Sequence, residues 1–519
     1  MKKLLIATIC GFATIASAET FQGVPSGRTT ITQASDPNNA LILDSSVGPN
    51  YSGIKETTYR SVSVTNGSSV GSFNMANGGL TLDANVASGD FNILTAANWA
   101  MNHTYLFLKN SVEDSTANLI LNVNNFYFVS GSAGQNQTMR FDSGKFTVNT
   151  SSTSKFEATV DGKIAKLEVF TGSNVTWNGA LTMEQNSVYD IYGKVSHDTG
   201  SLRIEKGSVA TIYEGGHLYK SASGSLVIAG TLNVQSGGKL ETVAGSSLAL
   251  TGTLNVDGYM ELYKISTGTG VYNQTSGSTK MHRGVNVQSG SNWTIYEKVV
   301  LEGATHKSDL SATCATLTID DGATFVIKNN ENGKAGNRAR LLFNGYNNLV
   351  LNKENGIVDE NGKAVSLATV AQTKEVEDAE GKVVQEAIEV INNKMTINAD
   401  QTFRSLYLGD FASLDIIMGD GVNLTFTEYV SFNTASDNAF LNIFNFQENT
   451  IKFNNESSGV LQKIESYIKL YGATEEDFLG FAKVSDAGFL TLITVPEPAE
   501  WAMIFGAIAL GLAIYRRRK

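Results

Sequence analysis

Few residues in this chain have the types and spacing that enzyme chemistry needs. Cleavage of a glycosidic bond uses two carboxyl groups about 5 to 9.5 Å apart. Asp320 and Asp321 are adjacent carboxylates, but they precede Gly322, and this composition is typical of a turn. Arg203 and Glu205 alternate around an apolar residue, which predicts an outward-facing ion pair between neighbouring coils. We therefore expect no catalytic residues.

The sequence also shows no pattern that is typical of a metal site or of a catalytic nucleophile. Cys314 lies in an alternating run of small and polar residues, which predicts a strand with a buried thiol. The five histidines do not have the spacing of metal ligands. They are His103, His197, His217, His282 and His306. The sequence thus predicts a non-enzymatic protein that holds no metal and no cofactor.

A three-part pattern near residue 500 has the chemistry of a processing signal. Its polar motif is Val495, Pro496, Glu497 and Pro498, and its basic tail is Arg516, Arg517, Arg518 and Lys519. Between them, residues 501–515 are uncharged, with aromatic residues at both ends, as in a membrane-spanning helix. Fifteen residues of helix cover only ~22 Å of a ~30 Å hydrocarbon core. We expect a short transmembrane helix that holds the chain temporarily.

The first residues predict export. A basic start at Lys2 and Lys3 precedes an apolar run, and Ala16 and Ala18 form a small-x-small cleavage site, so residues 1–18 are expected to be a signal peptide. Basic residues stay on the cytoplasmic side of a membrane. The body between the two terminal segments is therefore expected outside the inner membrane.

The three-part pattern resembles the PEP-CTERM sorting signal of bacterial exosortase substrates, with residues 496–498 as the motif, 501–515 as the helix and 516–519 as the basic tail. The resemblance implies a Gram-negative envelope and an exosortase-type membrane protease as partner. It also implies a transient inner-membrane tether in the periplasm, followed by a cell-surface or extracellular location. Ala499 and Glu500 depart from the small hydroxyl residues common in the family, which leaves the cut site open. An ordinary single-pass anchor is the alternative.

The composition of the body favours strands. The chain has 50 glycines, 17% charged residues and a formal net charge of −11. Its prolines are confined to positions 25, 37, 49, 496 and 498, which allows long stretches of continuous ladder hydrogen bonding. An acidic surface does not attract nucleic acid, so no nucleic-acid partner is expected.

Matched positions in the middle of the chain recur every 22 residues. Leu226 and Leu248, Gly230 and Gly252, and Val234 and Val256 are such pairs. A period of this length is typical of one coil of a solenoid. In residues 231–234 apolar Leu and Val alternate with Thr and Asn, so Leu232 and Val234 should point inward and Asn233 outward. The sequence predicts an all-β, right-handed parallel β-helix, and its Gly-rich coils resemble autotransporter passengers. A string of β-sandwiches is the alternative.

The pattern divides the chain into segments. We expect a β-solenoid with an N-terminal cap over residues 19–350, a charged insertion over 351–394 in the form of a hairpin or loop, and final coils with a helical cap over 395–494. Residues 495–519 form the sorting signal. The helix in the cap is predicted from the spacing of apolar residues. These residues are Leu461, Ile464, Ile468 and Tyr471.

Two outward features bear on function. Tyrosines recur near the predicted coil edges, where they could stack on sugars. They are Tyr189, Tyr192, Tyr213, Tyr219, Tyr259, Tyr263 and Tyr296. Asn233, Asn255 and Asn286 have similar settings and predict an amide ladder. The leading hypothesis is a surface or matrix protein in adhesion or exopolysaccharide association, with extracellular polysaccharide as partner. A polysaccharide lyase or hydrolase on a β-helix scaffold is the alternative. Ice binding would need more threonine rows than the pair Thr231 and Thr253.

Overall fold

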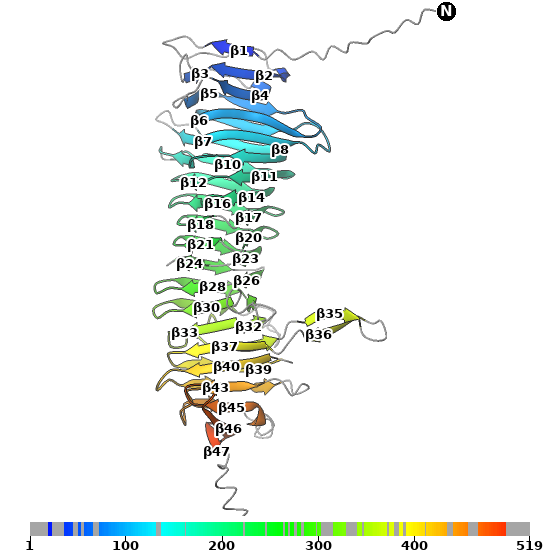
Figure 1. The fold of residues 1–519 in the computed structure, drawn as a ribbon. Coiled ribbons are helices and arrows are strands. Elements are labelled where there is room, and N and C mark those ends of the chain that lie inside the picture. Colours follow the sequence, from blue (N-terminus) through cyan, green and yellow to red (C-terminus); the bar gives the residue numbers. More distant parts are fainter. Residues whose placement is uncertain are drawn as a thin grey trace, which may run out of the picture. The chain divides into compact units, whose positions relative to one another are not determined.

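The structure, a computed structural model, consists almost entirely of β-strands (Figure 1). Across the described residues the one helical element is the 3-10 turn η4 (Glu465–Tyr467), so the all-β prediction is confirmed. The chain divides into two compact units, residues 1–246 and 247–519. The structure describes residues 19–22, 36–44, 50–52, 57–65, 72–130, 136–160, 162–221, 224–243, 246–262, 265–267, 270–274, 278–281, 285–296, 298–302, 315–328, 340–344, 347–370, 373–377, 383–387, 391–409, 412–432, 440–454 and 465–494.

The first unit combines longer strands near its beginning with short strands after them. The earlier strands are β1 (Glu19–Gln22), β2 (Asp36–Asp44), β3 (Asn50–Ser52), β4 (Thr57–Thr65), β5 (Ser72–Asp83), β6 (Asp90–Lys109), β7 (Asn118–Ser130) and β8 (Gln137–Asn149). The later ones are β9 (Ser154–Ala158), β10 (Ala165–Val169), β11 (Ser173–Asn178), β12 (Leu181–Met183), β13 (Ser187–Ile191), β14 (Lys194–Thr199), β15 (Leu202–Ile204), β16 (Val209–Ile212), β17 (His217–Lys220), β18 (Ser225–Ile228), β19 (Thr231–Val234) and β20 (Lys239–Thr242).

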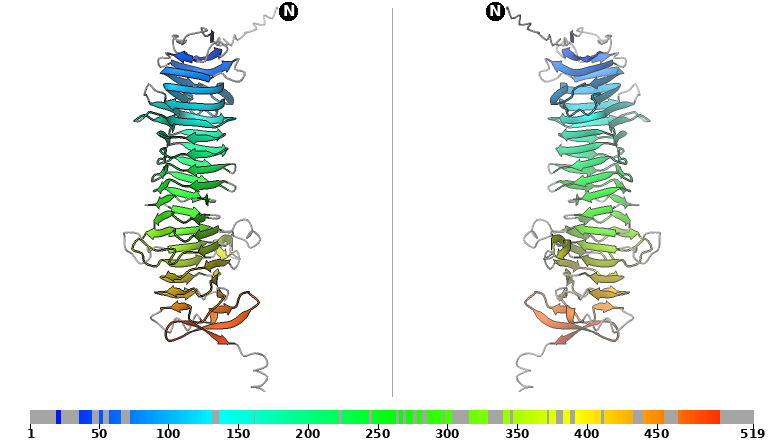
Figure 2. Two further views of the ribbon diagram at one scale, coloured as in Figure 1. Left: turned by 90° about the vertical axis from the view of Figure 1, so that its left-hand side faces the viewer. Right: turned by 90° about the vertical axis from the view of Figure 1, so that its right-hand side faces the viewer.

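In the later part of the first unit, each strand pairs in parallel with the third strand after it. Thus β10 pairs with β13, β13 with β16 and β16 with β19. The same rule joins β11, β14, β17 and β20, and also β9, β12, β15 and β18. Three successive strands therefore make one coil, and successive coils are stacked (Figure 2). Val188 lies opposite Val209, so the 21-residue spacing between them is one coil.

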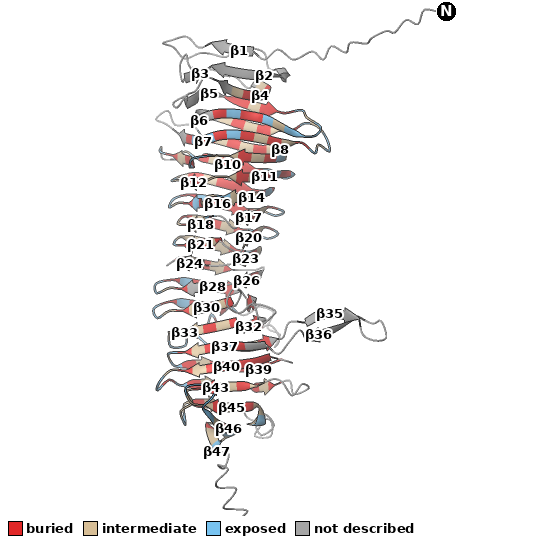
Figure 3. Cartoon of the chain, viewed as in Figure 1, coloured by how far each residue is buried: buried red, intermediate tan, exposed pale blue. Residues whose placement is uncertain are grey.

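This register aligns apolar side chains into columns inside the unit. Val169, Ile191, Ile212 and Val234 occupy equivalent positions in β10, β13, β16 and β19, and all four are buried. In β19, Leu232 and Val234 are buried while Asn233 between them is partly exposed, which confirms the predicted alternation. Figure 3 shows buried and partly exposed positions alternating along the strands of the coils. One coil alone would leave this apolar face in water, so the coils are stable only when stacked.

The second unit contains the remaining strands. Its first part holds β21 (Ser247–Leu250), β22 (Thr253–Val256), β23 (Tyr259–Leu262), β24 (Ile265–Thr267), β25 (Val271–Gln274), β26 (Ser278–Met281), β27 (Val285–Val287), β28 (Asn292–Tyr296), β29 (Lys298–Glu302), β30 (Ala315–Ile319), β31 (Thr324–Lys328), β32 (Arg340–Asn344), β33 (Asn347–Leu351) and β34 (Ser366–Val370). Its second part holds β35 (Thr373–Glu377), β36 (Val383–Ala387), β37 (Ile391–Ile397), β38 (Gln401–Phe403), β39 (Ser405–Leu408), β40 (Ala412–Met418), β41 (Leu424–Phe426), β42 (Val430–Phe432), β43 (Leu441–Phe444), β44 (Ile451–Phe453), β45 (Ile468–Tyr471), β46 (Phe478–Val484) and β47 (Leu490–Thr494).

Parallel columns of strands also form the second unit. One column runs β22, β25, β28 and β31, and another runs from β23 through β26, β29, β32, β34 and β39 to β42. In the first of these, Tyr272, Trp293 and Phe325 are in register and buried, with ring centroids 5.2 and 6.2 Å apart. Such offset stacks add to the burial of apolar area.

Two antiparallel elements interrupt the parallel pattern. Strands β35 and β36, within the predicted charged insertion, pair antiparallel with each other and form a separate two-stranded sheet. In the same predicted segment, β34 pairs in parallel with β32 and β39 and so belongs to the coils. At the other end of this unit, β45, β46 and β47 form an antiparallel sheet.

The predicted helix in the C-terminal cap is wrong for residues 468–471, which form strand β45. Ile468 and Leu470 are buried and alternate with Lys469 and Tyr471, a period of two that competes with the helical spacing. Pairing of β45 with β43 decides the outcome, because it continues the parallel column. Leu461 and Ile464 lie outside the described residues.

The predicted terminal segments, residues 1–18 and 495–519, also lie outside the described residues. Among the residues that are described, no helix is both long and apolar enough to cross a membrane. The transmembrane helix at 501–515 therefore stays a prediction.

Candidate functional site

The predicted sorting and cleavage residues are not part of the described structure. Val495 to Pro498 and Arg516 to Lys519 follow strand β47, which ends at Thr494, and Ala16 and Ala18 precede β1. Their roles stay predictions.

The carboxylate pair Asp320 and Asp321 forms the turn after β30, as predicted. The backbone N–H of Ala323 donates to the carbonyl oxygen of Asp320 at 3.1 Å, and the N–H of Gly322 donates to the Asp321 carboxylate at 2.9 Å. Asn352 donates to the Asp320 carboxylate at 3.2 Å. These contacts are structural. The Asp321 carboxylate accepts a hydrogen bond within the turn, and the Asp320 carboxylate accepts one from Asn352, which follows β33.

Arg203 and Glu205 form the predicted ion pair, with Nε and Oε1 2.6 Å apart. The pair lies within one coil, so the expectation of a contact between neighbouring coils is wrong. Their spacing of two residues places both side chains on the same face of the backbone.

The histidines whose side chains are described have separate settings. His217 contacts Glu241 at 2.6 Å, whereas His197 is completely buried. The side chains of His103, His282, His306 and Cys314 are not described. Within the described part of the chain, no three His, Cys, Asp or Glu residues are grouped in a way that could hold a metal ion.

A second carboxylate pair, not recognised in the sequence, lies on adjacent strands. Glu168 in β10 and Asp190 in β13 are direct neighbours in register. Lys166 contacts both carboxylates at 2.8 Å. Burial lowers the pKa of Lys166, but its hydrogen bonds to Asp190 and Glu168 more than offset this and raise the pKa overall. The ammonium group thus binds both carboxylates and makes the cluster a compact ion-pair network.

Three of the predicted tyrosines, Tyr189, Tyr192 and Tyr213, are either buried or stacked. Tyr189, predicted near a coil edge, is only 1% exposed and belongs to the core. Tyr192 and Tyr213 stack on each other with centroids 4.1 Å apart and planes at 11°. Phe170 packs against Tyr192 at 5.6 Å, and the guanidinium of Arg140 lies 4.7 Å from the Phe170 ring. The ring faces of this outer aromatic column contact one another, which leaves mainly their edges for a ligand.

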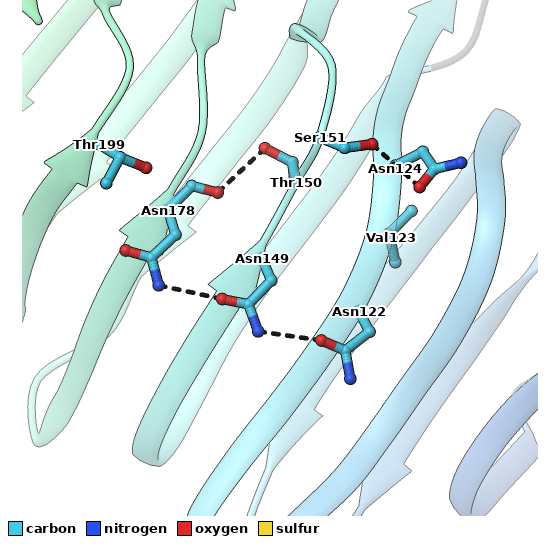
Figure 4. Close-up of a pocket in the computed structure, with 8 residues that line it drawn as sticks. All are labelled: Asn122, Val123, Asn124, Asn149, Thr150, Ser151, Asn178 and Thr199. Carbon is cyan, nitrogen blue, oxygen red and sulfur yellow. Dashed lines mark hydrogen bonds between the residues drawn. The ribbon is translucent and has the colours of Figure 1, made fainter.

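The candidate binding site is a polar groove in the first unit. It has a volume of about 340 Å³ and lies where strands β8, β11 and β14 end. Asn149 is the last residue of β8, Asn178 the last of β11 and Thr199 the last of β14. The lining residues are Asn122, Val123, Asn124, Asn149, Thr150, Ser151, Asn178 and Thr199 (Figure 4).

An amide ladder runs along this groove. Asn178 donates to the side-chain oxygen of Asn149 at 3.0 Å, and Asn149 donates to Asn122 at 2.9 Å (Figure 4). Beyond the residues drawn, Asn122 donates to Asn92 at 3.0 Å. The parallel register produces the ladder, because it places Asn122 beside Asn149 and Asn149 beside Asn178. Each amide is thereby fixed in orientation, and each retains hydrogen-bonding capacity beyond the ladder.

Hydroxyl groups line the second side of the groove. Thr150 donates through Oγ1 to the carbonyl oxygen of Asn178 at 3.2 Å, and Ser151 donates to the Asn124 side chain at 3.0 Å. A hydroxyl group can donate one hydrogen bond and accept two. Both side chains therefore keep acceptor capacity toward the groove.

Glycines keep the corner beside the groove free of side chains. Gly179 follows Asn178, and a Cβ placed there would lie 1.9 Å from the Thr150 hydroxyl oxygen. Gly200 follows Thr199 and has a φ of +72°, and its Cβ would lie 2.5 Å from the backbone carbon of Gly179. Only glycine fits this close approach of successive coils.

The groove combines uncharged polar groups with apolar surface. Its lining has amides, hydroxyls and Val123 but no charged side chain, so it offers neutral hydrogen-bond donors and acceptors and no carboxylate or imidazole. It can exchange hydrogen bonds with an uncharged ligand that carries many hydroxyl groups. The arrangement therefore suits the binding of such a ligand.

Sequence reasoning did not find this ladder. It singled out Asn233, Asn255 and Asn286, which the structure places elsewhere: Asn233 donates to Thr211 at 3.4 Å, Asn255 accepts from Asn273 at 3.1 Å, and Asn286 lies opposite Thr318. The separations in the groove, 27 residues from Asn122 to Asn149 and 29 from Asn149 to Asn178, exceed the 22-residue repeat. The available signal was an Asn at the end of both β8 and β11, Asn149 and Asn178.

No family model, no curated protein and no solved structure matches this chain.

Proposed function

We propose that this protein is an exported, non-enzymatic surface or matrix protein that associates with polysaccharide through the polar groove. The observation that carries the proposal is the row of oriented amides at Asn122, Asn149 and Asn178 beside the hydroxyls of Thr150 and Ser151. Neutral sugars present hydroxyl groups that both donate and accept, which matches amide and hydroxyl partners.

The spacing of the amides supports a polymeric ligand. Parallel strands lie about 4.8 Å apart, so the ladder repeats its amide at about that interval. A pyranose ring in an extended polysaccharide has a similar length. A chain lying along the ladder would meet an equivalent amide at each successive sugar.

The scaffold in this proposal is a right-handed β-solenoid. The three-strand coils in each unit and the buried columns of Val, Ile and Leu support a solenoid. Connections between parallel strands of one sheet are right-handed in about 98% of cases, which supports the handedness.

The location in this proposal follows from the two terminal segments. A signal peptide over 1–18 directs export, and the PEP-CTERM-like segment 495–519 tethers the chain to the inner membrane until an exosortase-type protease processes it. The protein then reaches the cell surface or the extracellular matrix, where adhesion or exopolysaccharide association is its role.

The groove is tested by affinity electrophoresis of the full-length protein in gels containing dextran or glucomannan, which are neutral, or alginate, which is acidic. Asn149→Ala removes the central amide of the groove. Asn273→Ala is the matched control, because it removes an equivalent ladder bond, at 3.1 Å, away from the groove. Circular dichroism verifies that both variants fold.

We expect a neutral polysaccharide to retard the wild type and the control equally, and Asn149→Ala to bind at least about fivefold more weakly, the effect of losing roughly 1 kcal/mol of hydrogen bonding. Equal retardation of the two variants, or a preference for alginate, would contradict glycan binding at this groove.

A further inference from the structure

The antiparallel sheet at the end of the second unit exposes large apolar side chains. Phe478 is 43% exposed, Phe481 37% and Ile493 45%. Phe481 lies directly opposite Ile493 in the pairing of β46 with β47. The rings of Phe478 and Phe481 have centroids 5.5 Å apart, and Tyr471 lies 5.4 Å from Phe478. We call these four residues the C-terminal aromatic face.

An irregularity in the sheet brings the two phenylalanines together. Residues three apart in a regular strand point to opposite faces. Here the register of β45 and β46 shifts between Leu470 and Tyr471, so that Tyr471 pairs with Phe478 and Leu470 with Gly480. Gly480 has a φ of +154°, and a Cβ there would lie 2.3 Å from the carbonyl oxygen of Ile493. The bulge therefore directs a second aromatic ring to the outer face.

The apolar segment predicted to enter the membrane lies close to this face in the sequence. Seven residues separate Ile493 from Trp501, where the uncharged segment 501–515 begins. Even fully extended, the eight residue steps from Ile493 to Trp501 reach at most about 29 Å. Any bilayer that holds residues 501–515 is thus within reach of the aromatic face.

The composition of the face matches the interface of a bilayer. Tyr concentrates at the level of the lipid headgroups, Phe and other apolar side chains insert just below it, and lysines extend to the surface beside them. The sheet carries Lys483, exposed on the same side as Phe481, and Lys469, which pairs with Phe481 across the strands. Residues 475–477 in the preceding turn are acidic. Attraction to the lipid must therefore come from apolar burial and not from net positive charge.

We propose that the C-terminal aromatic face contacts the bilayer surface, with Phe478, Phe481 and Ile493 inserted at the headgroup level while the chain is tethered. This inference rests on the proposed membrane tether. The bilayer contact holds the end of the coiled body against the membrane and positions Val495 to Glu500 at the surface, where a membrane-embedded protease would meet them.

The test uses the full-length protein in vesicles of phosphatidylcholine with brominated acyl chains, which quench nearby tryptophans. The four tryptophans include the buried Trp99, Trp177 and Trp293 and the fourth, Trp501. In a Trp501→Phe background, Phe481→Trp reports on the aromatic face. Tyr407→Trp, at an outward position 39% exposed in β39, is the matched control. The wild type reports on Trp501 and hence on the tether itself.

We expect the Phe481→Trp signal to fall about twofold in brominated relative to unbrominated vesicles, since a tryptophan at the interface lies near the upper acyl chain. The control signal should not change. Replacing part of the phosphatidylcholine with phosphatidylglycerol should leave the quenching unchanged, because charge does not drive the contact.

Three other results would overturn the proposal in distinguishable ways. Quenching of Trp501 in the wild type without quenching of Phe481→Trp would refute the bilayer contact and leave the tether intact. Loss of quenching at both positions would refute the tether as well. A blue-shifted, unquenched Phe481→Trp signal together with dimers in cross-linking would assign the face to a second copy of this chain instead.

Discussion

The ammonium group of Lys220 donates a hydrogen bond of 3.2 Å to the backbone carbonyl oxygen of His197, its register partner on the adjacent coil. Both residues are completely buried. Neither ring nitrogen of His197 has a hydrogen-bond partner among the described residues. Two ionisable side chains thus occupy inward positions that apolar residues fill elsewhere in these coils.

His197→Leu should stabilise the protein at neutral pH by about 1–2 kcal/mol, because it removes buried polar atoms that form no hydrogen bond. Urea unfolding monitored by circular dichroism measures the change. Val195→Ala, at the next inward position of β14, is the control and should destabilise the protein.

The same variant should remove a pH dependence. Burial first, and the nearby Lys220 charge second, lower the pKa of His197 to about 3, whereas an unfolded histidine has a pKa near 6.5. The unfolded chain therefore binds the proton first as the pH falls. Wild-type stability should decrease below about pH 6.5 by up to about 1.4 kcal/mol per pH unit, down to about pH 3. An identical slope in His197→Leu would show that other groups cause it.

Lys220 should determine how the stability of the protein depends on pH in the alkaline range. Burial lowers its pKa to about 8, against the opposing attraction of Asp198, while the unfolded value is near 10.5. The unfolded chain binds more protons between these values, so wild-type stability should increase from pH 8 to pH 10.5. Lys220→Met, which retains the length and volume without the charge, should flatten this increase. A persistent increase in the variant would argue against Lys220 as its source.

Asn149→Asp should destabilise the groove in a pH-dependent way. The substitution replaces the amide donor to Asn122 with a carboxylate oxygen and leaves two acceptors facing each other. We expect a loss of about 1–2 kcal/mol at pH 7 relative to the wild type. The difference should shrink below about pH 4, where the protonated carboxyl group can donate again. For Asn149→Ala the difference from the wild type should stay constant with pH.

Gly200→Ala and Gly215→Ala separate steric fit from backbone strain. Both glycines have a left-handed φ, +72° and +76°. A Cβ at Gly215 meets no atom within 4 Å, so the cost there should be the strain alone, about 1–2 kcal/mol. At Gly200 the Cβ would lie 2.5 Å from the backbone of Gly179 and force the coils apart. The melting temperature of Gly200→Ala should therefore decrease clearly more, and equal decreases would count against close approach at this corner.

Replacement of Pro496, Glu497 and Pro498 by alanines should block processing. We expect the variant to remain in the inner-membrane fraction with a greater mass than the processed wild type. Cell fractionation and intact-mass spectrometry measure both properties. An unchanged mass and location in the variant would refute the sorting hypothesis.

The parallel coils could be predicted from the sequence because their signal is local and repeated. Leu232, Asn233 and Val234 alternate in polarity, and the same alternation recurs after about 22 residues. That period determines both which side chains point inward and which strand pairs with which. No such repeat covers β45. Its four residues fit the apolar pattern of a helix and of a strand equally well, and pairing with β43 determines that they form a strand.

The binding groove was harder to predict because it depends on strand ends. Asn149 and Asn178 become neighbours only through the pairing of β8 with β11, and their separation of 29 residues differs from the 22-residue repeat. The C-terminal aromatic face likewise depends on one register shift near Gly480. Without this shift, Phe478 and Phe481 would lie on opposite faces of the strand, because they are three residues apart. Irregularities of this kind arise from packing and leave little trace in periodicity.

The hairpin of β35 and β36 shows how this scaffold accommodates extra sequence. Asn348 and Lys394 lie opposite each other although 46 residues separate them, compared with 21 for Val188 and Val209. The added residues leave the coil between two strands and return without changing the register. Such a junction is a natural grafting point, where a foreign peptide or a small domain could be displayed on the body by replacing the hairpin.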